Sequence, residues 1–156
     1  MADRGYESYN TFAHIEQKGD KYVVRGRESG TGICSGLNLP DTEEYDIEKE
    51  LYICKKHSKK VKTSPRKYKR IRSDATFDFF TDDCEEYRLN LRIVKIKLSE
   101  TTTEVLFTNL SKEEFSADDL KRLYHMRWGI ETAFDQLKYA LGAASVHSKN
   151  SESVSY

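Results

Sequence analysis

One stretch near the C-terminal end, YHMRWGIETAFDQLK, constrains the fold more than any other part of the sequence. It carries a phenol, a guanidinium, a carboxylate and an ammonium group at Tyr124, Arg127, Glu131 and Lys138. An α-helix turns by about 100° per residue, so these four positions fall within an arc of roughly 60°. Such a face is costly to place beside an apolar core and suits a site that handles phosphate groups and a metal ion.

An apolar stripe beside that polar face predicts how the helix is anchored. Ser116 and the two acids that follow it favour a helix start, and Gly142 is suited to a C-cap. We expect the stripe to pack in the core and the polar face to border a cleft. An alternative is a purely structural ion pair, because Arg127 and Glu131 are four residues apart. The stripe consists of Leu120, Leu123, Ile130, Phe134, Leu137 and Leu141.

Two short elements are expected at the N-terminal end. Ser8 is suited to cap a helix and Gly19 to end it. Residues 22–25 then predict a short strand, which the Gly- and Ser-rich residues 29–36 close. The apolar residues of the helix recur at three-residue spacing: Tyr9, Phe12 and Ile15.

The remainder of the chain favours β-structure. Residues 37–88 show no sustained helical period, and we expect a β-rich segment with long loops there. Residues 89–98 and 104–110 predict two strands joined by a polar turn. The second strand contains Val105–Phe107, a run that is apolar on both faces and is typical of a strand covered on both sides. The pattern as a whole predicts a mixed α/β (α+β) fold.

The composition is polar but indicates a folded domain. Hydrophobic residues make up 37% and charged residues 33%, while 12% aromatic residues provide material for a core. No apolar run approaches the roughly 18 residues of a membrane span, so we expect a soluble cytoplasmic protein with no membrane partner. Cys34, Cys54 and Cys84 are odd in number and far apart, which predicts reduced thiols rather than disulfides or a zinc site.

The formal net charge is zero, but the charges are segregated. Residues 41–50 hold six acids and one lysine, whereas residues 55–72 hold ten lysines and arginines and no acid. The basic run predicts a DNA-binding surface, and a solvated face or loop is the alternative. Its candidate DNA-binding residues are Lys59, Lys60, Lys67 and Lys69.

The order Y-x2-R-x3-E-x6-K in the helix resembles the signature of bacterial insertion-sequence transposases of the DDE class. The surrounding segments RWGIE and FDQLK resemble that family too, and Asp3-Arg4-Gly5-Tyr6 is similar to the segment with its middle carboxylate. The resemblance implies a partial ribonuclease-H-like core from residues 1–28 and 89–142. It also implies a β-rich insertion at 29–88 and a frayed tail at 143–156.

The same resemblance implies a function. Asp3 matches the second catalytic acid and Glu131 the third, and both would hold Mg²⁺ or Mn²⁺. Tyr124, Arg127 and Lys138 match residues that hold DNA phosphates near the transposon end. A two-metal DNA transposase that cleaves phosphodiesters and transfers strands is implied, with transposon ends and target DNA as partners and a homodimer in the intact protein. We expect the carboxyl groups of Asp3 and Glu131 to lie within about 10 Å of each other.

The sequence departs from the family pattern at the first catalytic acid. The family's first acid lies well upstream of the second, whereas only Met1 and Ala2 precede Asp3. We therefore expect a C-terminal part of a transposase that is inactive alone, with the two-ion site complete only in an intact relative. Two alternatives are a noncatalytic DNA-binding or oligomerising remnant and an unrelated α+β domain with a structural ion-pair helix.

Overall fold

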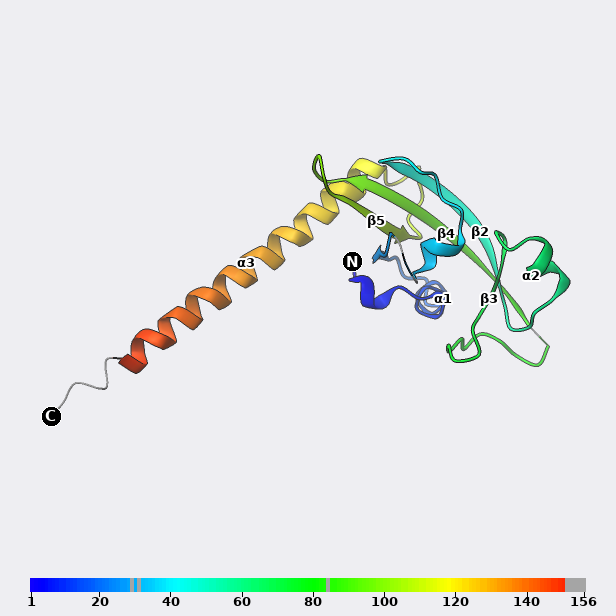
Figure 1. Cartoon of the computed structure of the whole chain (residues 1–156), viewed down its shortest axis with the longest axis horizontal. Helices are drawn as coiled ribbons and strands as arrows, with labels where there is room; N and C mark the ends of the chain where they lie inside the picture. The colour runs from blue at the N-terminus through cyan, green and yellow to red at the C-terminus, as the bar shows by residue number, and fades with distance from the viewer. Residues whose placement is uncertain (29, 31, 84, 151–156) are drawn as a thin grey trace. The chain divides into compact units, whose positions relative to one another are not determined.

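The computed structural model describes residues 1–28, 30, 32–83 and 85–150. The chain divides into two compact units, Met1–Ala117 and Asp118–Tyr156. The first unit contains a β-sheet with its own helices and core, and the second contains nearly all of helix α3 (Ala117–Asn150) (Figure 1).

The first unit is built on a five-stranded sheet with the strand order β1-β5-β4-β2-β3. Neighbouring strands are antiparallel except for β2 and β3, which are parallel. The longest pairing joins β2 to β4 from Tyr45 opposite Lys95 to Cys54 opposite Glu86. The predicted strands at 89–98 and 104–110 are confirmed, and the fold is mixed α+β. The strands are β1 (Val23–Gly26), β2 (Tyr45–Cys54), β3 (Tyr68–Arg70), β4 (Glu86–Lys97) and β5 (Thr103–Thr108).

The segment predicted to be β-rich with long loops supplies β2, β3 and the short helix α2 (Lys59–Thr63). Its two strands belong to the same sheet as β1, β5 and β4. The structure shows that β2 and β3 belong to one continuous sheet with the other three strands. That residues 29–88 form an insertion stays a prediction.

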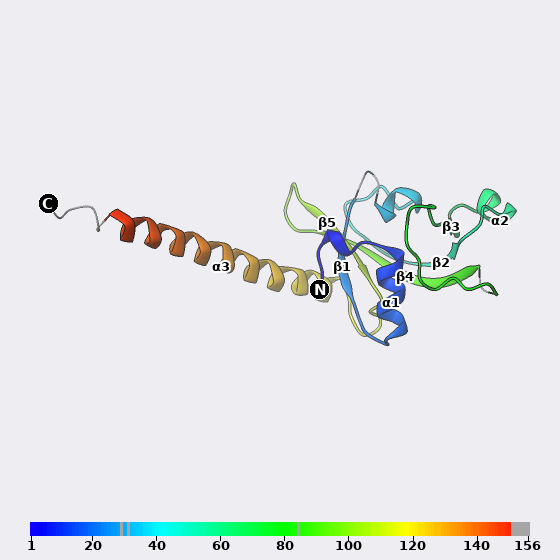
Figure 2. The ribbon, with the colours of Figure 1, turned by 90° about the horizontal axis from the view of Figure 1, so that it is seen from below.

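Helix α1 (Tyr9–Gln17) covers one face of the sheet (Figures 1 and 2). The Phe12 ring stacks on Tyr22 with 4.8 Å between centroids and lies 5.7 Å from the ring of Phe107. The helix begins where expected, because Ser8 Oγ accepts a hydrogen bond from the Thr11 backbone N–H at 3.0 Å. Gly19 follows its end with a φ of +73°, a conformation that favours glycine.

The opposite face of the sheet is also buried along β4 and β5. Val105–Phe107 are all 1% exposed or less, which confirms a strand covered on both sides. Arg92, only 3% exposed, donates two hydrogen bonds to the Asp46 carboxylate at 2.9 and 2.7 Å. Although burial alone would raise the pKa of Asp46, the hydrogen bonds and charge of Arg92 bring it below its ordinary value. The same guanidinium also fixes the loop before α3 through the backbone carbonyls of Leu110, Ser111 and Phe115.

The helix of the second unit differs from expectation at its C-terminal end. It begins after Ser116 as predicted, but it continues past the expected C-cap at Gly142 to Asn150, because Ala143 and Ala144 favour helix. The packing of the apolar stripe in the core stays a prediction, because each unit is described by itself. The exposed fractions of three of its residues are 38% for Leu123, 59% for Ile130 and 53% for Leu137.

Two of the three cysteines, Cys34 and Cys54, lie in the described part of the chain. Cys34 and Cys54 are buried free thiols, and burial raises the pKa of Cys34 to about 12. Cys84 and residues 151–156 of the predicted frayed tail lie outside the described residues. Within the described part of the chain, no helix combines the length and apolar character that crossing a membrane requires.

Candidate functional site

Asp3 lies at the end of a short parallel pairing beside β1. Ala2 forms a parallel bridge with Val24, in which the Ala2 N–H donates to Val23 O at 2.8 Å and Arg25 N–H donates to Ala2 O at 3.1 Å. Helix α1 connects these two parallel segments, as a crossover between parallel strands requires. Asp3 therefore occupies the carboxyl end of a parallel segment, where open α/β sheets place their ligand sites.

The Asp3 carboxylate is exposed and lies beside two arginines. Its Oδ1 accepts a hydrogen bond from the Arg4 backbone N–H at 2.8 Å and caps a short 3₁₀ helix, Arg4–Tyr6. The Arg25 guanidinium lies 3.5 Å from the same oxygen. The Asp3 side chain is 57% exposed, compared with 19% for Arg25. A carboxylate with this exposure and hard oxygen donors is chemically suited to Mg²⁺.

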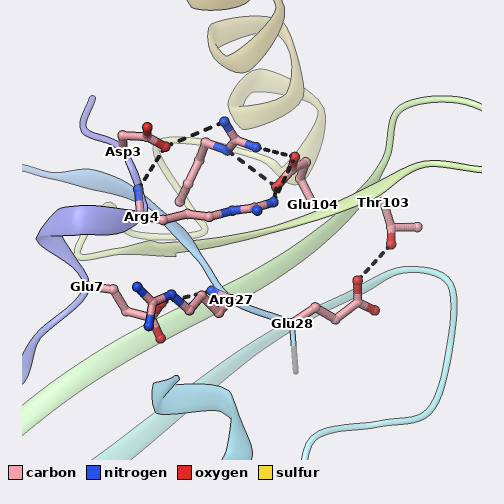
Figure 3. A network of polar contacts seen from close by, with 8 residues as sticks. Asp3, Arg4, Glu7, Arg27, Glu28, Thr103 and Glu104 are labelled. Atoms are coloured by element: carbon pink, nitrogen blue, oxygen red, sulfur yellow. Dashed lines mark hydrogen bonds and ion pairs between the residues drawn. The ribbon is translucent and has the colours of Figure 1, made fainter. Parts of the chain in front are cut away.

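A second acid, Glu104 at the start of β5, completes this cluster (Figure 3). Its side chain is 8% exposed and accepts from Arg25 Nη2 at 2.5 Å and from Arg4 Nη2 at 3.0 Å. Sequence reasoning missed Glu104. The available signal was an acid directly before the fully buried run Val105–Phe107, which places its side chain next to the core.

Two further carboxylates near this cluster have structural roles. Glu28 accepts hydrogen bonds from Lys95 and from Thr103 Oγ1, and these donors lower the pKa of Glu28, the Lys95 bond being the larger cause. Glu7 accepts from the backbone N–H groups of Arg27 at 2.9 Å and Ile33 at 2.6 Å and so fixes the loop after β1 (Figure 3). Among the residues that the structure describes, no three His, Cys, Asp or Glu side chains gather closely enough to hold a metal ion.

The four polar residues Tyr124, Arg127, Glu131 and Lys138 all lie on α3, in the second unit. The Tyr124 ring meets His125 edge-on with 6.2 Å between centroids, and Lys138 Nζ lies 4.0 Å from Asp135 Oδ1. The side chain of Glu131 lies outside the described part of the structure. The approach of Asp3 and Glu131 to within about 10 Å therefore stays a prediction.

The basic run forms α2 and β3, and acids from neighbouring strands lie beside it. Lys60 Nζ is 3.0 Å from Glu86, and Lys67 Nζ is 3.6 Å from Glu50. Lys69 Nζ donates to the Gly36 carbonyl, and partial burial lowers the pKa of Lys69. Lys59 is exposed on α2. The basic run contains no acid in its own sequence, but in the folded chain two acids lie beside it. They are Glu50 from β2 and Glu86 from β4.

Comparison with known proteins gives one match that spans nearly the whole chain. A family model described as a transposase DDE domain matches residues 1–155. Neither the curated proteins nor the solved structures contain a significant match. The match agrees with the mixed α+β fold and its five-stranded sheet. By its sequence over residues 1–155, the chain belongs to the transposase DDE domain family.

Proposed function

We propose that this chain carries part of the catalytic site of a DNA transposase of the Tyr-Arg-Glu-Lys subgroup, which cleaves phosphodiesters and transfers strands with a divalent metal. The observation that carries the proposal is the position of Asp3. This acid lies at the carboxyl end of a parallel segment and is exposed, within a chain whose family uses acids for phosphoryl transfer.

In this proposal, two acids hold the metal and three residues of α3 hold DNA phosphates. Asp3 and Glu131 would hold Mg²⁺ or Mn²⁺, which in such sites activates water and stabilises the leaving 3′-oxygen. Arg127 is suited to a forked contact with a phosphate, because its guanidinium is planar and always charged. Lys138 is suited to a point-charge contact with another phosphate, since its side chain is 79% exposed. Tyr124 would donate its hydroxyl to a phosphate oxygen.

Metal mapping tests whether the two acids share a site. Fe²⁺ bound in place of Mg²⁺, with ascorbate, cleaves the backbone close to the ion. We expect cleavage near residues 3 and 131 in the presence of DNA, and loss of both cuts in Asp3→Asn and in Glu131→Gln. Asp135→Asn is the matched control, because Asp135 lies one turn from Glu131 on the same helix. Cleavage that survives either acid substitution would contradict a shared site.

The chain by itself is expected to be inactive. No residue of this sequence matches the first acid of the family's three, and two carboxylates hold a metal pair incompletely. Purified chain should therefore not nick supercoiled plasmid DNA with Mg²⁺ or Mn²⁺. Metal-dependent nicking that Glu131→Ala abolishes would show that the chain retains a working site.

A noncatalytic role in DNA binding or oligomerisation is the second candidate. The observation that favours it is the exposure of Leu123, Ile130 and Leu137 on α3 together with the exposed lysines of α2. Such a protein would bind DNA and give no Fe²⁺-directed cleavage at residues 3 and 131. The mapping experiment therefore separates the two candidates.

A further inference from the structure

Arg92 on β4 is the least exposed cation in the part of the chain that the structure describes, at 3% exposure. Burying a guanidinium is unfavourable unless acceptors surround it. Asp46 supplies two acceptors, because its carboxylate oxygens accept from Arg92 Nε at 2.9 Å and from Nη2 at 2.7 Å. This pair joins β4 to β2 and leaves the Nη1 group of Arg92 directed to other partners.

Those other partners all lie in the linker between β5 and α3. The Nη1 group of Arg92 donates to three backbone carbonyl oxygens, at 3.1 Å to Leu110, 3.1 Å to Ser111 and 2.8 Å to Phe115. Phe115 lies two residues before α3 begins at Ala117. One buried side chain of the sheet therefore holds the linker up to the start of the helix.

Two further side chains tie the same linker to the sheet unit. Lys112 Nζ donates to the backbone oxygen of Asp46 at 2.7 Å. Asn109 Oδ1 accepts from the backbone N–H of Tyr22 at 2.9 Å. The linker is therefore held near its start by Asn109, in its middle by Lys112 and at its end by Arg92.

The length of α3 makes the direction in which it leaves the linker important for the proposed function. Glu131 lies fourteen residues after Ala117, which corresponds to about 21 Å along the helix axis. A change of about 10° in that direction would move Glu131 by about 4 Å, the separation of the ions in a two-metal site. Because a misplacement of about 1 Å can lower a rate about 100-fold, a site that includes α3 requires a firmly held linker.

We infer that Arg92 is a positioning residue: by holding the linker at Phe115, it limits the directions in which α3 leaves the sheet unit and so positions the polar residues of that helix. The inference rests on the proposed function, in which Glu131 holds a metal ion and Lys138 contacts a DNA phosphate. The competing explanation is that Arg92 only stabilises the sheet unit through its pair with Asp46.

Relaxation of ¹⁵N in the full chain tests the inference without metal or DNA. In the unmodified chain, the order parameters of amides 118–140, measured relative to the sheet unit, should be near the rigid value of about 0.85. Arg92→Lys should lower them below about 0.6 and leave those of β2 and β4 unchanged. Lysine keeps the charge beside Asp46, but its ammonium group cannot replace a planar fork that donates in two directions. Unchanged order parameters in α3 would overturn the inference.

A matched control separates positioning from loss of stability. Leu51→Ala removes a fully buried side chain of β2 and so lowers stability, but it leaves the linker contacts in place. The order parameters of α3 should not change in this variant, and a fall as large as that in Arg92→Lys overturns the inference. If Arg92→Lys fails to fold, Lys112→Ala decides, because the Lys112 side chain is 39% exposed. A fall in α3 then supports the inference, and unchanged values overturn it.

The failure of the inference and the failure of the proposed function give different results. Absence of an Fe²⁺-directed cut near residue 131 in the unmodified chain contradicts the proposed function, whereas the order parameters still decide whether Arg92 holds α3. A cut that depends on Glu131 should weaken in Arg92→Lys. If that cut persists at full strength in Arg92→Lys, the proposed function stands and only the inference is overturned.

Discussion

The sheet unit and helix α3 differ in how fully their apolar residues are buried. In the sheet unit, Phe12 and Phe107 are fully buried and the core has contributions from α1 and four strands. In α3, Leu123, Ile130 and Leu137 are 38–59% exposed. The sheet unit therefore has a core of its own, whereas α3 combines the buried Leu120 and Tyr124 with several exposed apolar side chains. An apolar stripe in a sequence predicts a helix better than it predicts which of its side chains are buried.

The largest expected effect is on the free energy of unfolding, and it compares one substitution in the sheet unit with one in α3. Phe107→Ala should lower the free energy of unfolding by about 3–5 kcal/mol, because it opens a cavity between the sheet and α1. Leu137→Ala on α3 should change it by less than about 0.5 kcal/mol, as at other exposed positions. Urea unfolding followed by circular dichroism measures both. Similar losses in the two variants would show that α3 has a core partner.

A second prediction concerns charged rather than apolar groups. Arg92→Ala should cost about 3 kcal/mol, since it removes the two short hydrogen bonds to Asp46 and the donor of three backbone carbonyls. Arg88→Ala is the control, because the Arg88 side chain is 61% exposed in its pair with Glu50 and should cost less than about 1 kcal/mol. Equal effects in urea unfolding would contradict the assigned difference in burial.

Substitutions in the basic run, residues 55–72, should have an effect of intermediate size, and that effect is on DNA affinity. Replacing Lys59, Lys60, Lys67 and Lys69 with Ala should weaken binding to all duplexes alike, by about tenfold at low salt, and should reduce the salt dependence. Single substitution of Lys69 should matter least, because its ammonium group donates to the Gly36 carbonyl. Fluorescence anisotropy at several salt concentrations measures this, with Lys18→Ala/Lys21→Ala as the control. An unchanged affinity would show that these lysines form a solvated surface that does not contribute to DNA binding.

The smallest effect is a dependence of stability on pH. The pKa of Asp46 is lowered in the folded chain, so the stabilisation from its pair with Arg92 is fully present above the unfolded value of about 3.9. It is lost as the pH falls through the folded pKa, below about pH 4. Unfolding free energies between about pH 5 and 2.5 should decline less in Asp46→Asn than in the unmodified chain, by on the order of 1 kcal/mol. Parallel declines would show that other acids govern this range.

The sequence by itself determined the elements whose signals are local. The Ser8 cap and the turn at Gly19 fix α1 within a dozen residues, and the two-sided apolar run of Val105–Phe107 predicts a buried strand. The acids at 118 and 119 mark the start of α3. Each of these signals acts between residues close in the chain, so no knowledge of distant partners was needed.

The tertiary structure alone decided which distant charges meet. Glu104 is joined to Arg4 and Arg25 across 100 and 79 residues, and Glu50 and Glu86 reach the basic run only because β2 and β4 pair in one register. No local pattern carries such partners, because they depend on strand order and register. An isolated acid in a sequence is equally compatible with solvent and with a buried ion pair, and only the packed sheet made Glu104 the latter.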